Sequence, residues 1–393
     1  MAMKWWTRAH KRDDEVMRLT MEQKVERWRR KWGEVYTFIL RVEHRSEVLL
    51  LVSVTDLSDS RSKERRRGNE GSSVLTLLFL CSYNGFSRIH AGSLNDEVLA
   101  LLSIKSGLID TSNYLKNREL LVEGWKNKFV HCNWTGVFCN SNCEVEKLDL
   151  SHKNLTGDIS NDIERLSSLA FFNISHNEFS SSLPKSISNL KFLRQLDVSI
   201  NYFNGGFPTD LERAVGLTLI VTYNNCFSGS LPGYLGNVTS LEILDLRGRY
   251  FEGTIPSSYK NLQKLKFLGL SGNNLTGRIP TMIGQISSLE SIFLGYNRFE
   301  GEIPREFGDL TNLRYLDLAT GSFSVHIPAE LGRLQEVQTM LLYNNRLEGE
   351  IPPEITNMTS LISLDLSRNR LSGEIPLGIS ELKNLEVLES DVY

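Results

Sequence analysis

The chain has 393 residues, 40% of them hydrophobic and 23% charged, which is typical of a globular protein. Its net charge of −3 conceals two unlike parts, because residues 1–73 carry 17 Lys/Arg against 12 Asp/Glu and the remainder carries 27 against 35. Only the first part is basic enough to suggest a nucleic acid or a membrane surface, and we expect no nucleic-acid partner for the protein. No run reaches 18 apolar residues, which excludes a membrane-spanning helix.

The first candidate element is an apolar run at Val74–Leu80. A basic cluster at Arg61–Arg67 precedes it, and the small residues Ala91–Ser93 follow it. This layout is that of a secretory signal, here residues 74–93. Residues 1–73 are then an extension from a misplaced start site, predicted to be poorly ordered. The alternative is that the run is a short buried segment.

A strict internal repeat follows. Aligned on the motif LDLS, a hydrophobic residue recurs every 24 residues. These positions are Leu148, Phe172, Leu196, Ile220, Leu244, Leu268, Ile292, Leu316, Met340, Leu364 and Leu388. Nine of the ten prolines keep the same step, from Pro184 to Pro376. A fixed period of this length indicates a repeat architecture.

Each unit has the pattern L-x-x-L-x-L-x-x-N-x-L-x-G-x-I-P, as in residues 265–280. The alternating L-x-L predicts a short strand with its leucines inward, and the asparagine can bond the turn and its neighbours. Gly-x-Ile-Pro turns the chain away, and the return path carries an apolar anchor such as Ile283 or Leu289. Stacked units bury one shared leucine face. We therefore predict an α/β repeat solenoid, a right-handed leucine-rich-repeat superhelix with a concave parallel β-sheet.

Ten full repeats occupy residues 145–384, and residues 385–393 begin an eleventh. Three units depart from the pattern, because Lys153, Arg249 and Gly321 replace the asparagine. In the last of these units, Val325 also replaces the glycine. We expect these departures to be local irregularities.

The segment before the repeats carries a recognisable motif. Residues 94–144 contain DEVLALL from Asp96, then Trp125, then CNWTGVFC from Cys132 to Cys139. Together with the L-x-G-x-I-P half-repeat, this segment resembles the N-terminal cap and ectodomain of plant leucine-rich-repeat receptor-like kinases. The sequence motifs are most similar to those of subfamily XI, which includes receptors for CLE peptides. The resemblance implies a Cys132–Cys139 disulfide and a cap that covers the first leucine layer.

The resemblance also sets limits. Family members continue into more repeats, a membrane helix and a kinase, so we expect this chain to be truncated before them. It has no Gly-rich loop with a strand lysine and no catalytic-loop motif. We therefore predict no enzyme activity, no catalytic residues and no cofactor. The alternatives are a secreted inhibitor of a cell-wall-degrading enzyme, resembling polygalacturonase-inhibiting proteins, and a truncated product without function.

Ligand recognition is expected on the concave strand face, where outward residues of successive units form columns. The candidate binding residues are Arg247, Phe267, Gly269, Ser271, Phe293, Gly295, Tyr296, Tyr315, Asp317 and Tyr343. Aromatic residues beside glycines favour a groove for an extended peptide of the CLE type, in agreement with the family. A co-receptor kinase would contact repeats that this chain lacks. The alternative is an exposed face without a ligand.

Other candidates are weaker. The aspartates of LDL share one column, and no two lie in adjacent units, so they predict at most an acidic strip. His152 and His176 lie 24 residues apart without a third ligand, which favours a solvated pair and no metal site. Cys143 and Cys226 are interpreted as buried free thiols.

Six N-x-S/T sequons suit a glycosylated protein of the secretory pathway. They begin at Asn133, Asn154, Asn173, Asn237, Asn274 and Asn357. We expect this chain outside the cell and its full-length relatives at the cell surface. Of the six, Asn173 lies on the predicted concave face, where a glycan would obstruct binding to the first units.

Overall fold

In the computed structural model the described residues are 96–112, 114–115 and 130–390. All of them belong to one of two compact units of the chain, Leu50–Tyr393. The predicted extension 1–73 and the signal segment 74–93 lie outside the described residues. Within the described part, no helix is long and apolar enough to cross a membrane.

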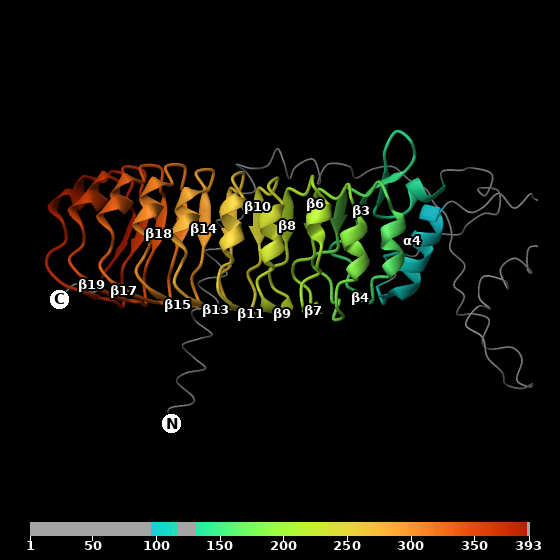
Figure 1. The fold of residues 1–393 in the computed structure, drawn as a ribbon, viewed down its shortest axis with the longest axis horizontal. Coiled ribbons are helices and arrows are strands. Elements are labelled where there is room, and N and C mark those ends of the chain that lie inside the picture. The colour runs from blue at the N-terminus through green and yellow to red at the C-terminus, as the bar shows by residue number, and fades with distance from the viewer. Residues whose placement is uncertain (1–95, 113, 116–129, 391–393) are drawn as a thin grey trace, which may run out of the picture. The chain divides into compact units, whose positions relative to one another are not determined.

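A long sheet of short strands runs through the described repeats, as Figure 1 shows. Its members are, in order, β2 (Val137–Cys139), β3 (Val145–Asp149), β5 (Phe171–Asn173), β6 (Gln195–Asp197), β8 (Leu219–Val221), β10 (Ile243–Asp245), β12 (Phe267–Gly269), β14 (Ser291–Phe293), β16 (Tyr315–Asp317), β18 (Thr339–Leu341), β20 (Ser363–Asp365) and β22 (Val387–Glu389). From β3 onward the strands are parallel, and each residue pairs with the residue 24 positions later, as Leu244 does with Leu268. The leucine-rich-repeat solenoid is confirmed.

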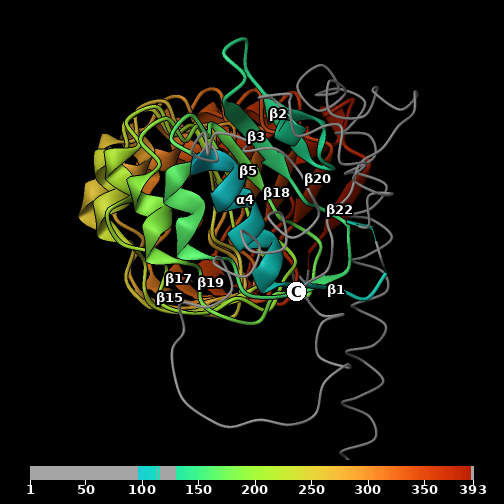
Figure 2. The same cartoon turned by 90° about the vertical axis from the view of Figure 1, so that its right-hand side faces the viewer.

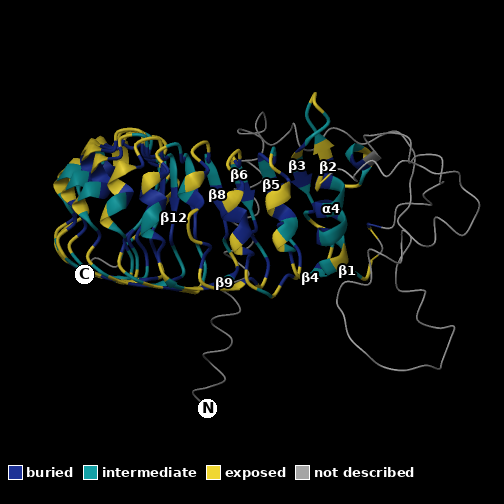
Figure 3. Cartoon of the chain, turned by 45° about the vertical axis from the view of Figure 1, so that its right-hand side comes forward, coloured by how far each residue is buried: buried dark blue, intermediate teal, exposed yellow. Residues whose placement is uncertain are grey.

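The leucines of the strands form the core, because alternate residues of a strand point to opposite faces. Leu244, Leu246, Leu268 and Leu270 are fully buried, and the buried residues recur in every turn of the stack (Figure 3). The residues between them, together with those that follow each strand, form an outward surface that we call the open face.

A second parallel sheet, which the repeat pattern did not predict, lies at another edge of the stack. Its described strands are β7 (Asn204–Gly205), β9 (Cys226–Ser230), β11 (Tyr250–Gly253), β13 (Asn274–Gly277), β15 (Arg298–Gly301), β17 (Ser322–Val325), β19 (Arg346–Gly349) and β21 (Arg370–Leu371). Buried rings support its inner side, since Phe179, Phe203, Phe227 and Phe251 follow one another with centroids 5.5–6.5 Å apart.

Each unit returns through a 3₁₀ turn that begins after the proline of Ile-Pro in most units. The turns cover Asn161–Arg165, Lys185–Asn189, Leu211–Arg213, Gly233–Asn237, Ser257–Asn261, Thr281–Gln285, Arg305–Asp309, Ala329–Arg333, Pro353–Asn357 and Leu377–Glu381. The view along the stack places these turns and the long sheet on opposite sides (Figure 2). The predicted anchors Ile283 and Leu289 are fully buried on this return path.

The asparagines link neighbouring units. In one unit, the Asn273 side chain accepts a hydrogen bond from Phe251 N and donates to Leu246 O and Leu270 O. The same arrangement recurs one unit later at Asn297. Buried backbone groups that the strands leave unpaired are satisfied in this way.

The first leucine layer is covered by a cap. Helix α4 (Asp96–Gly107) buries Leu101 and Ile104, and β2 pairs antiparallel with β3. A small sheet of β1 (Leu108–Asp110) and β4 (Leu155–Gly157) fastens the end of the helix to the first repeat. At the start of the helix, the Glu97 carboxylate accepts hydrogen bonds from Val145 N at 3.1 and 3.2 Å. A short 3₁₀ turn, Val130–Asn133, leads into β2.

Candidate functional site

The middle of the open face holds a charged side chain fixed among aromatic rings. Arg247 makes a two-pronged ion pair with Asp245, with Nε–Oδ1 at 2.8 Å and Nη2–Oδ2 at 2.6 Å. Its guanidinium carbon lies 5.3, 5.5 and 5.1 Å from the ring centres of Tyr223, Phe267 and Phe293. The arginine is therefore held by charge-assisted hydrogen bonds and by cation–π contacts.

The rings continue along the sheet from this arginine. Phe267 and Phe293 have centroids 5.1 Å apart, and Phe293 stacks on Tyr315 at 4.6 Å. All three rings are half-buried, so each keeps part of its surface free. We call Tyr223, Arg247, Phe267, Phe293 and Tyr315 the aromatic–arginine cluster.

The sequence predicted four members of this cluster and missed two participants. Tyr223 lies in the same column as Arg247, one unit earlier, and that column could have identified it. Asp245 was interpreted only as part of an acidic strip. Because it is 4% exposed and is paired with Arg247, its role is to position the guanidinium.

Two of the predicted glycines make room for neighbouring carboxylates. A Cβ on Gly269 would lie 2.8 Å from Asp245 Oδ1, and a Cβ on Gly295 would lie 2.5 Å from Asp317 Oδ1. Any larger residue at either position would displace the carboxylate. The glycines therefore shape the face and offer no functional group of their own.

The other predicted residues are Ser271, Tyr296, Asp317 and Tyr343. Tyr296 and Tyr343 share a hydrogen bond between their hydroxyl oxygens at 2.6 Å, which spans two units. Ser271 is half-buried beside the cluster. Asp317 pairs in register with Phe293 and accepts a hydrogen bond from Ala319 N at 3.0 Å. Burial raises the pKa of Asp317 to about 6, although this hydrogen bond and the charge of Arg247 oppose the shift.

The two histidines of the first units lie at the surface, since His152 is exposed and His176 is half-buried. Their rings stack, with centroids 3.9 Å apart and planes 19° from parallel. Both His152 and His176 have left-handed backbones, with φ of 56° and 55°, which orients the two side chains alike on adjacent turns. The two free cysteines differ from expectation, because Cys143 and Cys226 are only partly buried.

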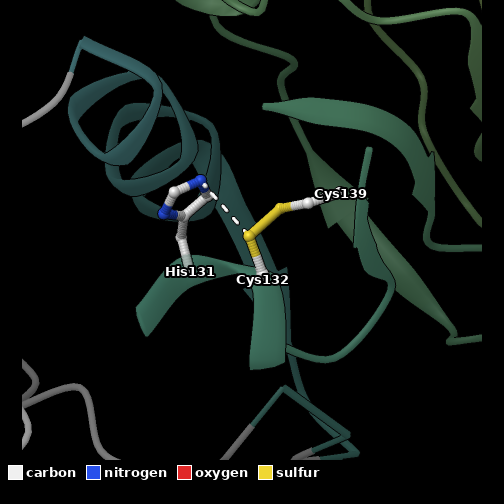
Figure 4. A group of neighbouring side chains, drawn as sticks. All are labelled: His131, Cys132 and Cys139. Atoms are coloured by element: carbon white, nitrogen blue, oxygen red, sulfur yellow. Dashed lines mark hydrogen bonds between the residues drawn. A yellow bond between two sulfur atoms is a disulfide. The ribbon is translucent and has the colours of Figure 1, made fainter. Parts of the chain in front are cut away.

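The cap contains the implied disulfide between Cys132 and Cys139. Figure 4 shows His131 beside it, with His131 Nε2 3.7 Å from Cys132 Sγ. His131 is fully buried and faces Glu97 at 3.4 Å. The side chains of His131, Cys132 and Cys139 are close enough together to bind one metal ion, but both sulfur atoms are bonded to each other in the disulfide. The cluster therefore stabilises the cap as it stands.

Two cavities in the described part of the chain lie away from the open face. One, of about 50 Å³, lies under the cap beside Leu101 and Trp134. The other, of about 370 Å³, opens beside Glu302, Val325 and His326. Val325 has a φ of 71°, a left-handed conformation that is strained for a β-branched residue.

Comparisons with known proteins agree with this architecture. Family models match for the leucine-rich-repeat N-terminal domain at residues 94–140, for a leucine-rich-repeat region at 293–393 and for single repeats at 168–190 and 264–286. The MDIS1-interacting receptor like kinase 1 of Arabidopsis thaliana is 51% identical over 119 residues, which are 30% of this chain and 11% of that protein.

Solved structures extend the similarity. A crystal structure of a TDR receptor is 43% identical, with a TM-score of 0.61, and the match covers 62% of this chain and 43% of that one. The Arabidopsis receptor kinase HAESA, solved with the peptide hormone IDA and the co-receptor SERK1, is 28% identical, with a TM-score of 0.62, over 76% of this chain and 54% of that one.

The chain is a leucine-rich-repeat protein of the plant receptor-kinase ectodomain type. Its matches to these kinases fall in the repeats and their N-terminal cap. The chain spans about a tenth of the length of the curated relatives that it matches and less than half of the TDR structure.

Proposed function

We propose that the chain is an extracellular ligand-recognition domain that binds a secreted, extended peptide of the CLE type on its open face. The observation that supports this proposal is the aromatic–arginine cluster, a row of half-buried rings fixed by the Asp245–Arg247 ion pair. Such rings gain most from contact with proline rings, aliphatic side chains and peptide backbone. The peptide hormone in the HAESA structure supports the same class of ligand.

The dimensions of the face agree with a peptide. From Tyr223 to Tyr343 the face spans five strand spacings, roughly 24 Å at ~4.8 Å per strand. An extended peptide rises by ~3.3 Å per residue, so about seven residues would cover this length. The strands bury their edges against one another, so recognition would use side chains and not strand addition.

The sequons leave this part of the face free. Asn237, Asn274 and Asn357 lie outside the long sheet, the first and last in exposed 3₁₀ turns and Asn274 at the start of β13. Asn173 lies on the open face, but it is two units before the cluster. We propose glycans at these sequons, together with Asn133 and Asn154, on a protein of the secretory pathway. A co-receptor, as in the HAESA structure, is proposed for repeats beyond those present here.

The test is binding of a panel of synthetic CLE-type dodecapeptides to the full chain by calorimetry. Phe293→Ala and Tyr315→Ala remove central rings and should each weaken the best binder by about 2 kcal/mol, roughly 30-fold. Tyr202→Ala is the matched control, since Tyr202 is 60% exposed and lies outside the long sheet. Equal affinity of the unmodified chain and the three variants for that peptide would show that the aromatic–arginine cluster does not bind it.

A further inference from the structure

One column of the open face allows a comparison within the molecule. Five aspartates of this column follow the strand leucines and accept a hydrogen bond from the residue two positions later. Three of these residues donate a serine hydroxyl at 2.6–2.7 Å, in the pairs Asp149–Ser151, Asp197–Ser199 and Asp365–Ser367. The fourth donor is the guanidinium of Arg247, which binds both oxygens of Asp245.

Asp317 is the exception in this column. The residue two positions later is Ala319, which offers only its backbone N–H, at 3.0 Å from Oδ1. No other hydrogen bond or ion pair to the Asp317 carboxylate occurs among the described residues. The side chain is nevertheless buried, with the whole residue 9% exposed. A buried carboxylate with so few donors favours a further donor, and most of all a positively charged one.

The surroundings of Asp317 match those that hold Arg247. Phe293 pairs with Asp317 across the sheet and stacks on Tyr315, which precedes it on the same strand. On the other side, the hydroxyl-linked pair of Tyr296 and Tyr343 bridges over the unit. The aromatic rings beside Asp245 contact the guanidinium of Arg247 at 5.1–5.5 Å. One of these rings, Phe293, also flanks Asp317, but no cationic side chain of the described residues forms an ion pair with the Asp317 carboxylate.

Small residues beside the Asp317 carboxylate leave room for a ligand group to reach it. Ala319 stands where the four other aspartate-bearing units carry serine or arginine, and Gly295 lies against Oδ1 without a Cβ. At the equivalent place three units earlier, the long side chain of Arg247 fills the space above Asp245. The unit of Asp317 therefore lacks the side chain that would complete the same arrangement.

We infer that Asp317 is the subsite for a cationic side chain of the bound peptide, a guanidinium or an ammonium group. This inference rests on the proposed function and adds to it a ligand specificity. The Asp245–Arg247 pair in the same protein shows the expected geometry. The cation of the ligand would bind the Asp317 carboxylate as the Arg247 guanidinium binds Asp245, and aromatic faces would flank it in the same way. The face then recognises a peptide whose cationic residue lies at one fixed distance from the residues on the Phe267–Phe293–Tyr315 stack.

The experiment selects ligands without assuming their identity. Random dodecapeptides are displayed and selected on the full chain, on Asp317→Asn and on Asp365→Asn as the matched control from the same column. We expect arginine or lysine to be enriched at one position on the unmodified chain and on Asp365→Asn, and not on Asp317→Asn. A selected peptide should bind Asp317→Asn roughly tenfold more weakly or worse.

A second measurement separates charge from shape. Replacing the peptide's arginine by citrulline, which is uncharged and of similar size, should weaken binding to the unmodified chain by the same factor and leave binding to Asp317→Asn unchanged. Peptides that depend on Phe293 but carry no enriched cation, and that bind Asp317→Asn equally well, would overturn the inference and leave the proposed function standing. A selection with no peptide that depends on Phe293 or Tyr315 would overturn both.

Discussion

The interruption of the asparagine ladder at Arg249 leads to a paired stability prediction. Asn273, in the next unit, is 5% exposed, and its amide satisfies three backbone groups, namely Phe251 N, Leu246 O and Leu270 O. Asn273→Ala leaves Phe251 N and Leu246 O without this partner, whereas Leu270 O keeps its hydrogen bond from Asn297. At about 1 kcal/mol for each of the two buried groups, the substitution should cost about 2 kcal/mol.

The converse substitution should stabilise the chain. By the 24-residue register, an asparagine in Arg249→Asn would face Phe227 N, Thr222 O and Leu246 O, as Asn225 faces the equivalent groups one unit earlier. Arg249 itself is exposed, so its loss removes little packing. We expect Arg249→Asn to add about 1 kcal/mol, the net value of a typical hydrogen bond.

Both effects are measured by urea unfolding of the full chain, with hydrogen exchange as the local readout. In Asn273→Ala the amide of Phe251 should exchange faster by a factor of roughly 30, which corresponds to about 2 kcal/mol. A loss below about 1 kcal/mol in Asn273→Ala, or a loss of any size in Arg249→Asn, would show that the asparagine ladder does not stabilise neighbouring units.

Three further predictions concern other features of the stack. The pKa of Asp317 is raised to about 6, above its unfolded value, so the ionised group opposes folding above pH 6 and the penalty disappears as the pH falls towards 4. Asp317→Asn should therefore stabilise the chain at pH 7 by up to about 3 kcal/mol, and not at pH 4, in urea titrations at both pH values. Val325→Gly relieves a left-handed φ at an exposed site and should raise the stability by about 1 kcal/mol in thermal unfolding. Gly229 has a φ of 87° and no atom near the position that a Cβ would occupy, so Gly229→Ala should lower the stability by a similar amount through backbone strain alone. Replacing both Cys132 and Cys139 by serine opens a loop with a sequence separation of 7 and should cost about 2.5 kcal/mol, read as faster exchange in the cap.

The fold was largely predictable from the sequence because one period determines it. Strand register, the leucine core and the asparagine bridges all follow from the 24-residue step, as the pairing of Leu244 with Leu268 shows. The second sheet was missed, although Tyr250, Phe251 and Glu252 alternate between exposed and buried. The glycine and proline that follow such segments in most units were interpreted only as a turn.

The candidate site was predictable in position but not in detail. Columns in the repeat give the unit and the face of Arg247, Phe267 and Phe293, because the backbone repeats. The columns do not give the orientation of a side chain, so they could not show that the Arg247 guanidinium lies against Asp245 and Tyr223. Exceptions within a column proved more informative than the shared pattern. The missing side-chain donor at Ala319 is the clearest of them.

Calorimetric titration of the CLE-type dodecapeptide panel into the full chain, Phe293→Ala and Tyr202→Ala shows whether the middle of the open face binds an extended peptide. We expect a binding peptide whose affinity falls roughly 30-fold in Phe293→Ala and stays within about twofold in Tyr202→Ala. A peptide that binds both variants as tightly as the unmodified chain, or a panel in which none binds, would contradict this expectation.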